Sequence, residues 1–263
     1  MNIHLRLETP ADYFAVENLT REAFWIYTNG GKSIDEHYLV HKLRKCPAFV
    51  PELDYVAELD GKLVGNIIFS KATITATNGM EHEILTFGPL SVLPEYQDKG
   101  IGQALLRHTI EEAKRLGYKA IVFHGHPDYY PRLGFKRAWE FGLTPDCDAC
   151  MAMELIPGAL NIPGGKHRED PVFFNLPEDE VAAFDKAFTL KAFRPFLPIG
   201  FLLDRLEPEA RSAIEGLQLD CLRKIGDHSE REVARLSGID AAALETIRSI
   251  LHGHGVQWGE RKT

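Results

Sequence analysis

The stretch from Leu85 to Phe135 constrains the fold of this chain more than any other part of it. An apolar run, Ile84 to Leu93, leads through a proline-containing segment to Gln97-Asp98-Lys99-Gly100-Ile101-Gly102. The apolar residues that follow recur at helical spacing and predict an amphipathic helix that ends at Gly117. Lys119 to His124 then predicts a second apolar strand. This order of strand, glycine turn, helix and strand indicates an α/β core with an anion site at the turn.

The two glycines of the turn let successive backbone N–H groups point inward at the start of a helix, where the helix dipole favours a phosphate. The pattern is not a P-loop, because no Gly-Lys-Ser/Thr ends it. It is not a dinucleotide fingerprint either, because Leu105 stands where the third glycine would be. A Gly-x-Gly pair alone is also typical of an ordinary glycine turn.

Two landmarks carry a family resemblance. Gln97, Gly100 and Gly102 match the signature Gln/Arg-x-x-Gly-x-Gly/Ala between a strand and a helix, and Tyr130-x-x-x-Gly134-Phe135 matches a second landmark downstream. The chain therefore resembles the GNAT superfamily of N-acetyltransferases. The resemblance implies an α/β (α+β) fold with a mixed, mostly antiparallel central sheet flanked by helices. It also implies acetyl-CoA as cosubstrate.

The resemblance further implies the residues of the site. The pantetheine arm would pair with the strand, and the amides of the turn would hold the pyrophosphate. These cofactor-binding residues would be Leu90, Ser91, Val92, Gln97, Asp98, Lys99, Gly100, Ile101 and Gly102.

Tyr130 would be the acid that protonates the departing thiolate, with Tyr129 as the adjacent competitor. Gly88-Pro89 favours a local break or bulge that could aim a main-chain N–H at the oxyanion. The general base stays open between Glu83, His124 and a water chain.

The function expected from this resemblance is transfer of an acetyl group from the CoA thioester to a primary amine, by direct attack in a ternary complex. The acceptor is a small molecule or a protein amine. The alternative is an acetyl-CoA-binding regulatory protein with little or no catalysis, whose C-terminal helices contact a partner protein or DNA.

Composition excludes several other classes. The chain has 263 residues, 44% of them hydrophobic, and a formal net charge of -8, which argues against a general nucleic-acid or anionic-membrane binder. No apolar run predicts a membrane span, so we expect a cytoplasmic enzyme. Cys147 and Cys150 form a lone Cys-x-x-Cys pair, and without a second pair we expect reduced thiols and no metal site.

The remaining elements follow from local patterns. Ile3 to Leu7 predicts a strand, and a helix should follow Thr9-Pro10. Asp60-Gly61 between alternating apolar runs predicts a hairpin, and Asn78-Gly79 predicts another turn. Ile34 to Lys45 predicts a helix. Lys136 to Phe141 and Ala149 to Leu155 predict late strands, with a helix expected before them.

The region of residues 26–50 tends to cover the acceptor site in the superfamily. Its candidate acceptor contacts are Tyr27, Asp35, Glu36 and His37, which would equally suit a solvated face. Within the superfamily, the chain resembles a bacterial branch often called YhbS-like. This resemblance covers about residues 1–190.

Residues 191–263 predict a separate helical appendage. Pro208 to Leu219 and Ser229 to Leu251 have helical patterns, with Ser229 a candidate N-cap and Gly238-Ile239 a candidate turn. Nine Lys and Arg against eleven Asp and Glu from Leu203 onward favour packing or homodimer contacts over a DNA-binding surface.

Overall fold

The computed structural model describes residues 3–25, 34–144, 147–188, 199–219, 221–253 and 258. The chain divides into two compact units, Met1–Phe24 with Ser33–Thr189 and Trp25–Lys32 with Leu190–Thr263. The predicted organisation into a domain of residues 1–190 and an appendage of residues 191–263 stays a prediction.

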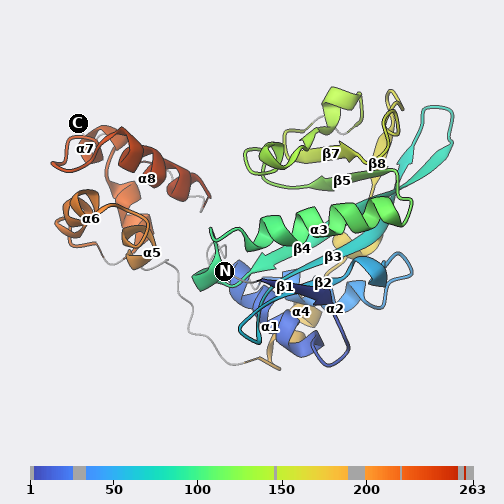
Figure 1. The fold of residues 1–263 in the computed structure, drawn as a ribbon, viewed down its shortest axis with the longest axis horizontal. Helices are drawn as coiled ribbons and strands as arrows, with labels where there is room; N and C mark the ends of the chain where they lie inside the picture. The colour runs from blue at the N-terminus through green and yellow to red at the C-terminus, as the bar shows by residue number, and fades with distance from the viewer. Residues whose placement is uncertain are drawn as a thin grey trace. The chain divides into compact units, whose positions relative to one another are not determined.

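The first unit is a mixed sheet with helices on both faces (Figure 1). Its strands are β1 (His4–Leu7), β2 (Tyr55–Leu59), β3 (Lys62–Thr75), β4 (Glu81–Val92), β5 (Ala120–His124), β6 (Lys136–Arg137), β7 (Cys150–Glu154) and β8 (Lys166–Arg168). Its α-helices are α1 (Tyr13–Phe24), α2 (Glu36–Leu43), α3 (Ile101–Arg115) and α4 (Glu178–Asp185).

The strands follow the order β1-β2-β3-β4-β5-β7-β6, and β8 pairs with β3. All neighbouring strands are antiparallel except β4 and β5, which are parallel. The predicted fold class, a mixed and mostly antiparallel sheet flanked by helices, is therefore confirmed.

The predicted turns are confirmed by their backbone angles. Asp60 and Gly61 both have positive φ, 52° and 76°, as a two-residue turn between right-twisted strands requires. Gly79 has a φ of 84° between β3 and β4, and the Asn78 side chain accepts a hydrogen bond from the Met80 N–H. Gly117 follows α3 with a φ of 86°.

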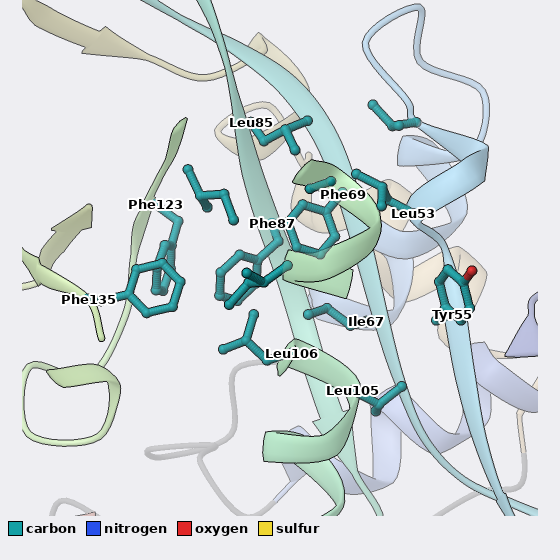
Figure 2. Packing of buried hydrophobic residues seen from close by; sticks show 14 of the residues in the cluster. Leu53, Tyr55, Ile67, Phe69, Leu85, Phe87, Leu105, Leu106, Phe123 and Phe135 are labelled. Carbon is teal, nitrogen blue, oxygen red and sulfur yellow. The ribbon is translucent and has the colours of Figure 1, made fainter. Parts of the chain in front are cut away.

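Period-two alternation assigns each strand residue to one face of the sheet. Ile67, Phe69, Leu85 and Phe87 meet Leu105 and Leu106 of α3 in the largest apolar cluster, shown in Figure 2. Strand residues of the opposite parity face the other side of the sheet. On that side, Val56 and Ile68 pack against α1 and α2. Helix α3 therefore covers one face, and α1 and α2 cover the opposite face.

Two expectations about the late part of this unit are wrong. Only Lys136–Arg137 of the predicted strand is extended, because a 3-10 turn, Ala138–Phe141, follows it. The Glu140 carboxylate accepts the Arg137 N–H, and Gly142 ends the turn with a φ of 74°. Between β5 and β6 a single 3-10 turn, Tyr130–Leu133, replaces the expected helix, with Pro131 in its first positions.

The second unit is helical throughout its described elements. It contains α5 (Gly200–Leu203), α6 (Pro208–Glu215), a 3-10 helix (Leu222–Asp227), α7 (Glu230–Val233) and α8 (Ala241–Gly253). Ser229 caps α7 in a capping box with Glu232, as predicted. Gly238 turns the chain with a φ of 98°, and a Cβ there would lie 2.6 Å from the Glu209 carbonyl oxygen. The turn therefore rests directly on α6.

One buried carboxyl should make the stability of the first unit depend on pH. Asp54 is 3% exposed, and burial together with the neighbouring Glu8 raises its pKa. The folded protein then holds a proton that the unfolded chain releases above about pH 4, so the free energy of unfolding falls as the pH rises.

Replacing this carboxyl with an amide should remove that penalty. We expect Asp54→Asn to gain stability over the wild type between pH 5 and pH 8, by up to about 1.4 kcal/mol per pH unit. Thermal unfolding at several pH values measures it. Asp60→Asn, at an exposed turn position, is the control. A difference between Asp54→Asn and wild type that does not change with pH would contradict the assignment.

Candidate functional site

The two parallel strands at the centre of the sheet part from one another. β4 and β5 share one registered position, Leu85 opposite Ile121. β4 then continues to Val92, whereas β5 ends at His124. Among the described strands, the part of β4 from Thr86 to Val92 pairs only with β3.

The free edge of β4 presents backbone groups at alternate residues. The Leu93 N–H donates to the Val64 carbonyl of β3 at 2.9 Å. Because hydrogen-bonding direction alternates along an antiparallel strand, the N–H and C=O groups of Leu90 and Val92 point away from β3. An extended amide-bearing ligand could pair with the N–H and C=O of Leu90 and with the N–H of Val92, because the Val92 C=O already accepts a hydrogen bond from Gln97 Nε2.

The expected irregularity at Gly88-Pro89 is confirmed. Leu90 lies opposite Ile67 and Phe87 opposite Phe69, so β4 contains one more residue than β3 between these two pairs. This β-bulge bends β4 just before its free edge begins.

The turn before α3 has the geometry of an anion site. Asp98 and Gly100 have φ values of 57° and 81°, so the backbone twice enters the left-handed region before the helix. The first helical N–H groups of α3 have no intrahelical acceptor, no side chain caps the helix, and its first turn contains no acidic residue. These N–H groups and the helix dipole would favour a phosphate.

Two predicted side chains stabilise the turn itself. Gln97 Nε2 donates to the Val92 carbonyl oxygen at 3.1 Å and so fastens the turn to the end of β4. Lys99 Nζ donates to the Glu95 carbonyl oxygen at 2.7 Å. The glutamine of the signature, Gln97, therefore has a structural role, which is to hold the turn against the end of β4.

Ser91 differs from the strand residues on either side of it. Its Oγ donates to Thr20 Oγ1 at 3.2 Å, and Thr20 Oγ1 donates to Asn66 Oδ1 at 3.2 Å. All three residues are buried. The Ser91 side chain therefore links β4 to α1, whereas Leu90 and Val92 pack against the cluster on the α3 face.

The two adjacent tyrosines lie in different surroundings. A Cβ built on Gly102 would lie 3.5 Å from the Tyr129 hydroxyl, 3.6 Å from Val92 and 3.9 Å from Leu90. The Tyr129 hydroxyl is therefore near the first turn of α3 and the end of β4. Burial raises the pKa of Tyr129.

Tyr130 belongs to an aromatic cluster between the parted strands. Its ring centroid is 4.6 Å from that of Phe123 and 5.9 Å from those of Phe87 and Phe135. Gly125 makes room for this ring, because a Cβ there would lie 2.4 Å from a Tyr130 ring carbon.

The two candidate bases lie far apart along the sheet. Glu83 is at the exposed start of β4, where it pairs with Lys71 at 3.1 Å. His124 ends β5, and its Nδ1 is 3.5 Å from Glu169 Oε2. The Glu169 interaction raises the pKa of His124. Sequence reasoning missed Glu169, because only the tertiary fold brings it to His124.

Among the candidate acceptor contacts, Glu36 and His37 are more enclosed than residues of a solvated face, whereas Asp35 is exposed. His37 is completely buried, and burial lowers its pKa to about 4. Burial raises the pKa of Glu36 to about 7. Asp35 precedes α2, and Tyr27 lies outside the described residues.

A comparison with protein families agrees with this geometry. Residues 52–137, which include the parted strands, the turn and the aromatic cluster, match the family described as the acetyltransferase (GNAT) domain. This part of the chain is therefore similar to the GNAT acetyltransferase domain. The resemblance drawn from Gln97, Gly100, Gly102 and Tyr130 is thereby confirmed at the level of the family.

The chain is also similar to curated proteins that are named as N-acetyltransferases. The chain is 37% identical over 99 residues to the uncharacterized N-acetyltransferase YjhQ of Escherichia coli K12, which is 37% of this chain and 54% of YjhQ. The match thus spans about half the length of that relative. The chain is also 28% identical over 134 residues to the uncharacterized N-acetyltransferase YhbS of the same strain. That match covers 51% of this chain and 74% of YhbS.

Two solved structures of GNAT proteins are also similar to this chain. The E. coli YhbS structure, a complex with CoA, matches with a TM-score of 0.58 at 26% identity and covers 67% of this chain and 94% of its own. A Brucella melitensis GNAT structure with acetyl-CoA matches with a TM-score of 0.53 at 29% identity, covering 65% and 98%. No helix among the described residues is long and apolar enough to span a membrane.

Gly125→Ala should disturb the aromatic cluster. The new Cβ would overlap Tyr130 and also Phe123, at 2.5 Å, so one ring must move. We expect a loss of about 1–3 kcal/mol in the free energy of unfolding, as for other overpacked sites. Denaturant unfolding and near-ultraviolet circular dichroism would measure it.

Gly200→Ala is the matched control, because a Cβ there meets nothing within 4 Å. Equal stability of the two variants would contradict the close packing of Tyr130 over Gly125.

Proposed function

We propose that this protein is an acetyl-CoA-dependent N-acetyltransferase that moves an acetyl group from the CoA thioester to a primary amine. The amine attacks directly in a ternary complex. The observation that carries the proposal is the free edge of β4, which leads to the uncapped N-terminus of α3. An extended chain with amides and a pyrophosphate at one end is complementary to both features.

In this proposal the pantetheine amides pair with the N–H and C=O of Leu90 and with the N–H of Val92. The pyrophosphate lies on the N–H groups of Lys99, Gly100, Ile101 and Gly102, where the helix dipole stabilises its charge. The structures of YhbS with CoA and of the Brucella protein with acetyl-CoA support this choice of cosubstrate. The acceptor is a small-molecule or protein amine.

The chemistry needs two groups besides the cofactor cradle. When the amine attacks, the thioester carbonyl becomes an oxyanion, which a main-chain N–H of the free β4 edge would stabilise. The C–S bond then breaks, and the Tyr130 hydroxyl would protonate the thiolate as it departs. The proton that the attacking nitrogen loses would pass to water, and the Tyr130 hydroxyl would be restored from water. The bulge at Gly88-Pro89 lies directly before this edge of β4.

Charge at Gly102 tests the cofactor cradle. We expect Gly102→Glu to weaken acetyl-CoA binding at least about tenfold more than Gly102→Gln, because only the carboxylate repels the pyrophosphate. The two side chains are nearly equal in volume, so Gly102→Gln controls for steric effects. Isothermal titration calorimetry measures the affinities.

The thermal stability of the same pair separates binding from folding. A carboxylate in the first turn of a helix is stabilising, so Gly102→Glu should unfold no earlier than Gly102→Gln. Equal affinities of the two variants for acetyl-CoA would overturn the placement of the pyrophosphate.

Tyrosine variants test the proposed acid. Tyr130→Phe should lower kcat by about 10²–10⁴-fold with an acceptor found in a panel of amines, amino acids, polyamines and peptides, because general acid catalysis typically contributes that much. Its acetyl-CoA affinity should stay near that of the wild type. Thiol release measures turnover, and Tyr118→Phe, a half-buried tyrosine after α3, is the control.

The outcome also shows which of the two tyrosines is the acid, and whether the protein is an enzyme or a regulatory protein. Loss of turnover in Tyr129→Phe but not in Tyr130→Phe would overturn the assignment of the acid. Tight acetyl-CoA binding by the wild type without turnover on any amine would favour the regulatory alternative instead.

A further inference from the structure

A second group of chemically active side chains lies on the sheet face opposite α3. Phe123 of β5 and Met151 of β7 belong to the cluster that α3 covers. Their neighbours His124 and Cys150 therefore point to the other face, where they are direct partners in the antiparallel pair of β5 and β7. His167 of β8 points to the same face, opposite Ile74 of β3.

These three residues offer converging metal ligands. One ligand atom from each of His124, Cys150 and His167 lies within 4.8 Å of the other two. His167 is 9% exposed, and its Nε2 is buried without a hydrogen-bond partner. A buried ring nitrogen without a partner is costly unless something else coordinates it.

The next shell has the arrangement that metal-binding histidines require. His124 Nδ1 is 3.5 Å from Glu169 Oε2, and Thr86 Oγ1 donates to Glu169 Oε1 at 2.8 Å. A carboxylate on one ring nitrogen fixes the tautomer and leaves the other nitrogen free for a metal. Thr86 in turn fixes the carboxylate from β4.

We propose that His124, Cys150 and His167 bind a transition-metal ion of the zinc class, with Glu169 orienting His124. Two imidazoles and a thiolate are the ligands that zinc prefers, and a set of three leaves a fourth position for water. The His124 side chain is 42% exposed, so that position has access to solvent.

The proposed ion would join the short strand β8 to the well-paired strands β5 and β7. β8 has three residues and pairs with β3 over three positions, whereas the ligands come from β5, β7 and β8. A metal bound to all three would link β8 to the pair of β5 and β7. It would also occupy His124, which removes this residue from the candidate general bases.

Cobalt and zinc are the probes. The untagged full-length protein is stripped with a chelator and reloaded with Co²⁺ or Zn²⁺ under reducing conditions. We expect one equivalent of bound metal by mass spectrometry, a thiolate-to-cobalt charge-transfer band, and a higher melting temperature with Zn²⁺.

Variants assign the ligands. Cys150→Ser should lose the charge-transfer band, and His167→Gln should lose the bound equivalent. Glu169→Gln should weaken metal affinity by about 10–100-fold, as expected for a residue that orients a ligand. Cys46→Ser, a free thiol elsewhere in the same unit, should retain the band and the stoichiometry.

Acetyl-CoA binding in each preparation is the independent control for folding, because its proposed cradle lies on the α3 side of the sheet. A wild-type protein that binds acetyl-CoA but no metal would overturn the metal site alone. A charge-transfer band that persists in Cys150→Ser would also overturn it. Loss of turnover in His124→Gln with no metal in the wild type would assign this cluster to the reaction itself.

Discussion

The arrangement of the first unit depends on the parting of β4 from β5. A strand inside a sheet normally satisfies its backbone N–H and C=O groups on both sides, and leaving them unpaired in a buried place is costly. Here β4 is hydrogen-bonded to β3 along its length but meets β5 in register only at Leu85. The N–H and C=O of Leu90 and the N–H of Val92 are therefore available for a partner other than a strand.

Several features hold that edge in place. The bulge opposite Ile67 and Phe69 bends β4, and Gln97 fastens the turn before α3 to the Val92 carbonyl oxygen. From the other face, the hydroxyls of Ser91 and Thr20 connect β4 to α1 in a fully buried hydrogen-bond chain. A rigid edge of this kind can bind an extended ligand with little loss of conformational entropy on the protein side.

The two faces of the sheet are chemically different. The α3 face is lined by aromatic and aliphatic side chains, including the cluster around Tyr130. The opposite face near the end of β5 contains imidazole, thiol and carboxylate groups within a few ångströms of one another. Because strand residues alternate between faces, Phe123 and His124 belong to these separate environments although they are adjacent in sequence.

Local sequence determined the turns, the cofactor signature and most of the elements. Turns and caps depend on the conformational preferences of a few neighbouring residues, so the sequence predicts them well. Examples are the turn at Asp60-Gly61, the helix end at Gly117 and the helix cap at Ser229. The strand predicted over Lys136 to Phe141 was wrong because a carboxylate contact at Arg137 and the glycine at 142 outweighed strand propensity. Tertiary structure alone decided that Tyr129 and Tyr130 face different surroundings, and that His124, Cys150, His167 and Glu169 converge. That convergence depends on the order in which distant strands pair, and spacing along the chain does not encode it.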